Sequence, residues 1–185
     1  MKIPLNPKRF WQQLRNELTA LFKHSLHDAA KYNGLAIEQW EGMPAQYTAH
    51  LDTEHDNQEA PSFIAVNASL PSEEKAYQIA LTLGGHLRIQ RRDSLVIDRP
   101  WKQRLFDQAP VEFRDKVLHL DNEVRAFWLM YWHAGKKDFF GFYRSHPEKK
   151  RIAYYHTAIS DYIFWRLRIQ TWVFKFFYPL ALYEN

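Results

Sequence analysis

The chain has 185 residues, of which 46% are hydrophobic and 25% charged, a balance typical of a globular protein with its own buried core. It contains no cysteine, which excludes thiol catalysis, disulfides and cysteine-bound zinc, and its formal net charge of +4 is too small to indicate nucleic-acid binding by itself. The first residues lack the apolar run of a signal peptide, and no stretch of about 18 uncharged apolar residues occurs. We therefore expect a cytoplasmic protein without a transmembrane span.

A long amphipathic helix is predicted over residues 6–34. Asn6 can cap it, Pro7 suits the first helical position, and Gly34 can end it. We expect its apolar stripe to belong to the core. The stripe consists of Phe10, Trp11, Leu14, Leu18, Leu21, Phe22 and Leu26.

Three short strands are predicted next, over residues 36–40, 45–51 and 62–69. Gly42 and Pro44 mark the turn between the first two. The polar segment 52–61 separates the second from the third and is expected to be an exposed hairpin loop. Acidic residues around His55 in this segment leave a metal site as the alternative.

A helix is predicted over residues 72–85, with Ser72 placed to cap it. Apolar residues recur there at three- and four-residue spacing and give the helix one apolar face. Gly84 and Gly85 are expected to interrupt it. The apolar face consists of Ala76, Ile79, Ala80 and Leu83.

The strand, turn and helix up to Leu87 resemble the ImmA/IrrE type of metallopeptidase domain, which has a zincin-like fold. In zincins this helix carries His-Glu-x-x-His, whose two histidines bind zinc while the glutamate activates water. Here Tyr77-Gln78-Ile79-Ala80, followed by Leu83-Gly84, retains the frame of the motif.

The resemblance implies that the catalytic residues have been lost. It places Leu81 and Gly85 at the two ligand positions and Thr82 at that of the general base. A shift of one residue would instead bring His86 to the second ligand position. The third zinc ligand of the family is a glutamate on a later helix, and Glu123, in Glu-Val-Arg-Ala-Phe-Trp, matches it. These five residues form the expected remnant cleft, and neither a catalytic nor a metal-binding residue is predicted.

Helices are also predicted over residues 100–106, 111–118 and 120–133. A basic patch precedes and enters the first of them, and it could bind phosphate or simply be solvated surface. Within the third, Glu123 could equally be a first-turn acid that favours the helix dipole. The basic patch comprises Arg88, Arg91, Arg92, Arg99, Lys102 and Arg104.

The last predicted element is a long aromatic helix over residues 147–177, with Ser145 as its cap. One face, from Ile152 to Phe176, is expected to pack on the domain, against the stripe of the N-terminal helix. Trp165, Trp172 and Phe174 lie elsewhere around the helix and are expected to form a partner surface.

The predicted fold class is therefore α+β and zincin-like, with a small antiparallel or mixed sheet of about three strands and several helices. Residues 1–140 would form the degenerate zincin-like domain, and residues 141–185 a helical extension packed on it.

Three functions remain open from the sequence. The first is a pseudo-enzyme without cofactor that binds a protein or itself, which the resemblance implies could be regulatory in a bacterium or mobile element. The second is a nucleic-acid or membrane-surface module that uses the basic and aromatic residues of the last third. The third is a metalloenzyme with a non-standard site. Its candidate ligands are His86, His119, Glu123, His133, His146 and His156.

Overall fold

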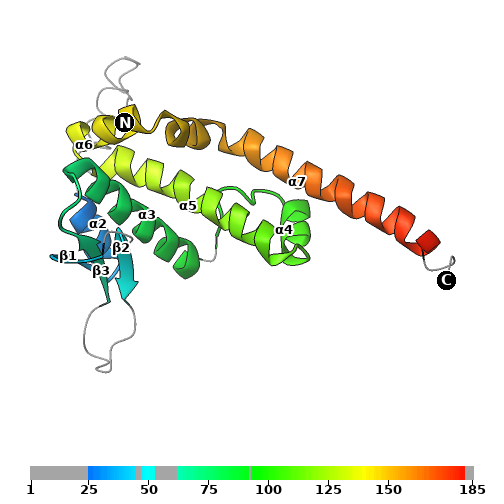
Figure 1. Cartoon of the computed structure of the whole chain (residues 1–185), viewed down its shortest axis with the longest axis horizontal. Coiled ribbons are helices and arrows are strands. Elements are labelled where there is room, and N and C mark those ends of the chain that lie inside the picture. The colour runs from blue at the N-terminus through cyan, green and yellow to red at the C-terminus, as the bar shows by residue number, and fades with distance from the viewer. Residues whose placement is uncertain (1–24, 45–46, 53–61, 92, 182–185) are drawn as a thin grey trace, which may run out of the picture.

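The computed structural model of the chain describes residues 25–44, 47–52, 62–91 and 93–181. Six helices and three strands lie in these ranges (Figure 1). They confirm the predicted α+β class. In chain order they are α2 (Leu26–Tyr32), β1 (Ala36–Trp40), β2 (Ala49–Asp52), β3 (Phe63–Asn67), α3 (Ser72–Arg91), α4 (Pro100–Asp107), α5 (Val111–His133), α6 (Lys136–Ser145) and α7 (Pro147–Ala181).

The sheet is mixed and three-stranded, as the sequence predicts. The strand order is β1-β3-β2, with β3 parallel to β1 and antiparallel to β2. The central strand is the most buried, since Ile64 and Val66 have no exposed surface, which explains its continuous apolar run. Of the predicted hairpin loop 52–61, Asp52 is the last residue of β2, and residues 53–61, with His55, lie outside the described part.

Helix α3 lies between the sheet and α5 and packs on both (Figure 1). It is unbroken from Ser72 to Arg91, so the predicted interruption at Gly84 and Gly85 is wrong. The glycines serve packing instead, because a Cβ atom at Gly84 would lie 3.0 Å from the Cβ atom of Arg125 on α5. Glycine at this position lets the two helix backbones approach closely.

Two other sequence predictions about helices need correction. Ser25 has an extended backbone (ψ 168°) and caps α2 in a capping box with Asp28, so the predicted helix 6–34 does not run unbroken through Ser25. Residues 1–24, with most of the apolar stripe, lie outside the described residues. The predicted helices 111–118 and 120–133 are one helix, α5.

Helix α6 has no counterpart among the predicted elements and includes residue 140, where the domain boundary was expected. Its C-terminal residue is Ser145, whose Oγ atom donates a hydrogen bond to the carbonyl oxygen of Gly141. Ser145 therefore belongs to α6 and is not the predicted cap of α7, which begins at Pro147. Phe139 and Phe142 of α6 are buried in the largest core cluster, together with residues of α3 and α5.

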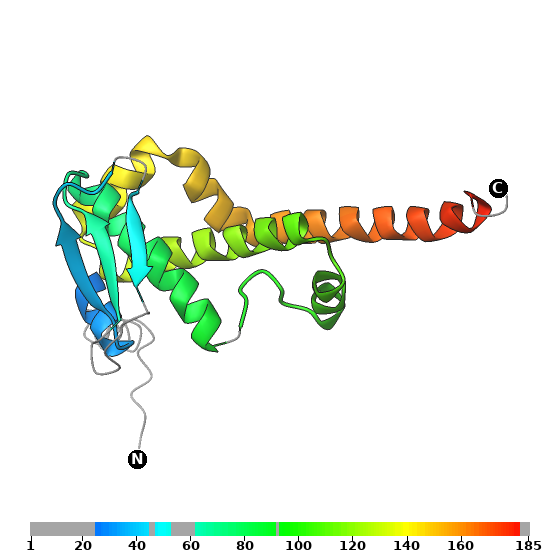
Figure 2. The ribbon, with the colours of Figure 1, turned by 60° about the horizontal axis from the view of Figure 1, so that its bottom comes forward.

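Helix α7 is long, as predicted, and has two parts. Its first half packs on α4, α5 and the loop before α4 through Ile152, Ile159, Ile163 and Phe164. Its second half extends beyond every other described element (Figures 1 and 2). The face expected to pack on the domain is covered at Ile152, Ile159 and Ile163. Tyr155, Tyr162 and Ile169 of the same predicted face are exposed, which corrects the prediction for them. The predicted contact with residues 10–22 lies outside the described part.

We expect alanine to have opposite effects on the free energy of unfolding at Gly84 and Gly85. A Cβ atom at Gly85 would lie 3.5 Å from Nδ2 of Asn122, an ordinary contact, so Gly85→Ala gains helix propensity and raises the free energy of unfolding by about 1 kcal/mol. Gly84→Ala gains the same propensity but is overpacked against Arg125, so it is neutral or destabilising by about 1–2 kcal/mol. Urea denaturation of both variants measures the difference, and equal stabilisation would contradict the close α3–α5 contact.

Candidate functional site

The five residues of the expected remnant cleft lie on the neighbouring helices α3 and α5. Leu81 packs against the largest core cluster, and Gly85 lies against the side chain of Asn122. Thr82 and His86 are half-buried on α3. Glu123 is buried on α5, and its hydrogen bonds and ion pairs lead to other residues.

Glu123 is held by a tyrosine and a lysine that the sequence analysis did not single out. The Tyr77 hydroxyl donates to Oε2 of Glu123 at 2.7 Å, and Nζ of Lys149 donates to Oε1 at 2.7 Å. Nζ of Lys149 also donates to the Tyr77 oxygen at 2.7 Å, which closes a triangle. Glu123 is only 3% exposed, whereas Lys149 is partly exposed. The lysine therefore supplies a positive charge beside a carboxylate that is buried in the core.

The triangle connects three helices: Tyr77 is on α3, Glu123 on α5 and Lys149 on α7. Aromatic packing fixes the tyrosine, because its ring stacks on Phe142 at a centroid distance of 4.0 Å and an interplanar angle of 13°. Nζ of Lys149 lies 4.8 Å from the centroid of the same ring. The geometry therefore orients Glu123 toward structural partners within the core.

Burial and the Glu123 carboxylate together raise the pKa of Tyr77 far above its ordinary value of 10.0. The phenol is therefore a hydrogen-bond donor at neutral pH and cannot serve as a base. The neighbouring Tyr143 has a raised pKa for the same two reasons, burial first and Glu123 second.

The described residues do not fit a catalytic zinc site. Nε2 of His86 is buried without a hydrogen-bond partner among them, and burial lowers the pKa of this ring. His119 is exposed, with its Nε2 atom 3.6 Å from Oε1 of Glu123. Zinc needs three protein ligands around an open position. Within the described ranges, no three histidines, aspartates or glutamates are placed to hold a metal.

One residue of the predicted basic patch, Lys102, is buried in ion pairs and does not belong to the surface. Lys102 is fully buried, with its Nζ atom 2.7 Å from Oδ1 of Asp98 and 2.7 Å from Oδ1 of Asp161. Nζ also donates to the hydroxyl of Ser160 at 2.9 Å. Lys102 therefore joins α4 to α7 and is unavailable to a phosphate, which corrects the sequence interpretation for this residue.

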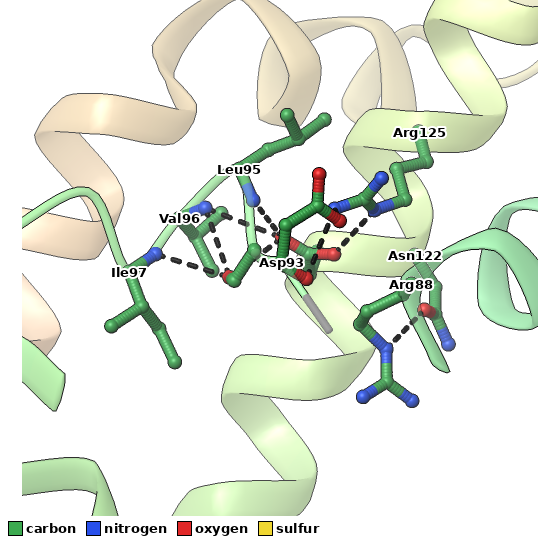
Figure 3. Close-up of polar contacts among 9 residues, drawn as sticks. Arg88, Asp93, Leu95, Val96, Ile97, Asn122 and Arg125 are labelled. Atoms are coloured by element: carbon green, nitrogen blue, oxygen red, sulfur yellow. Dashed lines mark hydrogen bonds and ion pairs between the residues drawn. The ribbon is translucent and has the colours of Figure 1, made fainter. Parts of the chain in front are cut away.

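A second buried cation, Arg125, anchors the loop that joins α3 to α4 (Figure 3). Its Nε atom donates to Oδ2 of Asp121 at 2.7 Å, and its Nη2 atom donates to Oδ1 of Asp93 at 2.7 Å. Oδ1 of Asp121 accepts hydrogen bonds from the backbone amides of Leu95 and Val96. These bonds satisfy the polar groups of a half-buried loop.

Part of this network could have been found in the sequence. Asp121 and Arg125 are four residues apart on a predicted helix, a spacing typical of an ion pair. The pairing of Glu123 with Lys149 and Tyr77 could not have been found in this way, because Lys149 is 26 residues and Tyr77 is 46 residues away from Glu123 in the sequence.

The predicted partner surface is exposed where its side chains are described. Trp165 is 51% exposed and Trp172 is 64% exposed, while the side chain of Phe174 lies outside the described part. The Trp165 ring contacts the Trp101 ring at a centroid distance of 5.8 Å. The guanidinium carbon of Arg168 lies over the Trp165 ring, 5.0 Å from its centroid. The surface thus combines apolar rings with positive charge.

Comparison with protein-family models, curated proteins and solved structures finds no match to this chain. Among the helices described, none has the length and apolar character needed to cross a membrane. The functional argument therefore depends on the residues and their geometry.

Removing the lysine of the triangle should destabilise the fold. Lys149→Met leaves the Glu123 carboxylate buried without a cation and lowers the free energy of unfolding by about 2 kcal/mol, a value reduced for the partial exposure of Lys149. The control is Lys150→Met, which removes a neighbouring charge that lies 6.0 Å from the Tyr154 ring and changes stability by less than about 1 kcal/mol. A larger loss in the control than in Lys149→Met, by urea denaturation, would contradict the structural role of the triangle.

Alkaline pH should unfold the protein through the buried tyrosines. The pKa values of Tyr77 and Tyr143 are raised in the folded chain, so their contribution to the free energy of unfolding is fully present below pH 10. It decreases above pH 10, because the phenols then ionise in the unfolded chain but not in the folded one. Each contributes a slope of about 1.4 kcal/mol per pH unit there, so Tyr77→Phe and Tyr143→Phe should each flatten the decline by that amount. The measurement is urea unfolding at several pH values above 10. Tyr32→Phe, at an 89% exposed residue, should leave the slope unchanged.

Proposed function

We propose that this protein is a non-catalytic, metallopeptidase-like protein that acts by binding another protein, in a regulatory role in a bacterium or mobile element. The observation that carries the proposal is the engagement of Glu123. This residue stands where the resemblance implies a zinc ligand, and both of its carboxylate oxygens are held by Tyr77 and Lys149 at 2.7 Å. A carboxylate bound in this way is unsuited to metal coordination.

The α3 residues support the same proposal. Leu81 and Gly85 stand at the implied ligand positions, and neither side chain can bind zinc. Thr82 stands at the position of the general base and has no carboxylate to activate water. The order of the described elements, a mixed sheet followed by α3 and a later glutamate-bearing helix α5, agrees with the resemblance.

We propose α7 for the binding function because it carries several exposed apolar side chains close together on one helix. Trp165, Ile169 and Trp172 are each more than half exposed on one helix. Exposed apolar groups of this size, when they lie together, mark contact sites in other proteins.

A membrane-surface or nucleic-acid role is the second candidate, favoured by one observation. Arg168 lies over the face of Trp165, and such a pair can hold an anionic surface or stack on a base. The burial of Lys102 beside its two aspartates counts against a phosphate-binding face.

The proposal predicts neither bound zinc nor proteolysis. Protein purified without a histidine tag should contain far less than one zinc per chain by elemental analysis. It should also leave unfolded casein uncleaved, with or without added zinc. Stoichiometric zinc, or a metal-dependent cleavage that disappears in His86→Ala, would contradict the proposal. Glu123→Ala is unsuitable here, since it would also leave Lys149 and Tyr77 without their acceptor.

A further inference from the structure

Six exposed apolar residues of α7 follow a heptad pattern, while Tyr154, also exposed, falls outside it and has its ring against Phe127 of α5. Their spacing alternates between three and four, so they form a narrow stripe of the a and d type. Four of the six are aromatic. In order they are Tyr155, Ala158, Tyr162, Trp165, Ile169 and Trp172, here called the α7 seam, and all are exposed.

Apart from Trp165, whose ring also contacts Trp101 of α4, the seam lies on the opposite side of α7 from the contact with the rest of the chain. Ala153, Ser160 and Phe164 are buried there, and Phe164 packs against Val117 and Val124 of α5. The seam residues lie on the other face of the helix. Because α7 has a covered face and a separate apolar stripe, burial within one chain does not explain the stripe.

A stripe of two positions per heptad fits another helix better than a lipid surface. An interfacial helix needs a wide apolar face, whereas the a and d positions make a narrow one. Arg166 and Arg168 flank the seam on its two sides, as polar residues flank the core of a coiled coil. The second half of α7 extends beyond the other described elements, and isolated helices of this length are marginal.

We infer that the α7 seam binds the same seam of a second copy of this chain, with the two helices antiparallel. This inference rests on the proposed function only in taking protein binding as the role of α7. An antiparallel pair centred between Tyr162 and Trp165 places Tyr162 opposite Trp165 of the second copy. The same register places Ala158 opposite Ile169, and Tyr155 opposite Trp172.

Packing favours the antiparallel pair over the parallel one. In a parallel pair in register, Ala158 would face Ala158 and Trp165 would face Trp165, which leaves a gap in one layer and crowds another. In the antiparallel pair the smallest residue faces a larger aliphatic one, and each indole faces a phenol ring. The layers then differ less in volume than those of the parallel pair.

The flanking charges and the available area agree with a second copy. In this register Asp161, whose side chain is 33% exposed, lies opposite Arg168 of the other copy, and the contact occurs twice by symmetry. The exposed seam side chains can bury on the order of 600 Å² from each copy. That area lies at the lower limit for a specific dimer, so the association should be measurable and reversible.

The first test is the oligomeric state of the full chain, measured by sedimentation velocity over a concentration series. The wild-type chain should form a dimer, and Ile169→Asp should raise the dimer dissociation constant about tenfold or more, because it places a carboxylate in the seam. The matched control is Gln170→Asp. It adds the same charge at the next residue, which is exposed but outside the seam, and should change the constant by less than about threefold. A monomeric wild-type chain, or equal effects of both variants, would overturn the inference.

The second test determines orientation. Since the chain has no cysteine, single cysteines report only the new contact. Under mild oxidation Ala158→Cys and Ile169→Cys should each form little disulfide alone, but their mixture should form a disulfide-linked heterodimer. Rapid disulfide formation by Ile169→Cys alone would indicate the parallel pair and overturn the antiparallel geometry.

The outcome separates this inference from the proposed function. A dimer that also cleaves casein with zinc would refute the proposed function and leave the seam intact. A monomer without zinc or cleavage would refute the seam alone. A monomer that binds vesicles of phosphatidylserine and phosphatidylcholine through Trp165 and Trp172 would also refute it, in favour of a membrane surface.

Discussion

The buried carboxylate of Glu123 is the constraint on which the helical part of this structure depends. A carboxylate removed from water is strongly destabilising unless a cation and hydrogen-bond donors surround it. Lys149 supplies the cation and Tyr77 a donor, and each reaches Glu123 from a different helix. The side chain that the resemblance implies as a zinc ligand therefore fixes how α3 and the beginning of α7 lie against α5.

Helix α5 carries a second set of buried charges, one turn or less from Glu123. Asp121 and Arg125 hold the loop before α4, and Lys102 then joins α4 to α7 through Asp98 and Asp161. Gly84 lets α3 approach α5, and these polar contacts then connect α3, α4, α5 and α7. The buried charges of these two networks are satisfied by one another.

The two faces of α7 follow from this arrangement. Ser160 and Phe164 are buried against the loop before α4 and against α5, and this contact fixes the rotation of α7 about its axis. Once the rotation is fixed, Ile169 and Trp172 are exposed, and Trp165 is half-exposed beside Trp101 of α4. The seam is therefore presented by a helix that is rigidly attached at one end, which suits a contact with another rigid helix.

Local pattern in the sequence determined the type and approximate place of most described elements. The apolar run at Ile64–Val66 gave a buried strand, and the spacing in residues 72–85 and 147–177 gave helices, because these signals depend on neighbours a few residues away. The three- and four-residue spacing of the exposed apolar residues in α7 is also a pattern of the sequence. Only the tertiary structure decided that this stripe, and not Ile152 and Ile159, is the exposed one.

Tertiary contacts also decided the role of Gly84, Lys102 and Glu123. Residue type favours a helix break at Gly84 and a solvated or phosphate-binding charge at Lys102, while the resemblance implies that Glu123 is a remnant ligand. Each residue instead meets a partner far away in the chain: Arg125, Ser160 and Lys149 respectively. No local pattern encodes such pairings, since they exist only after the helices have packed and excluded water.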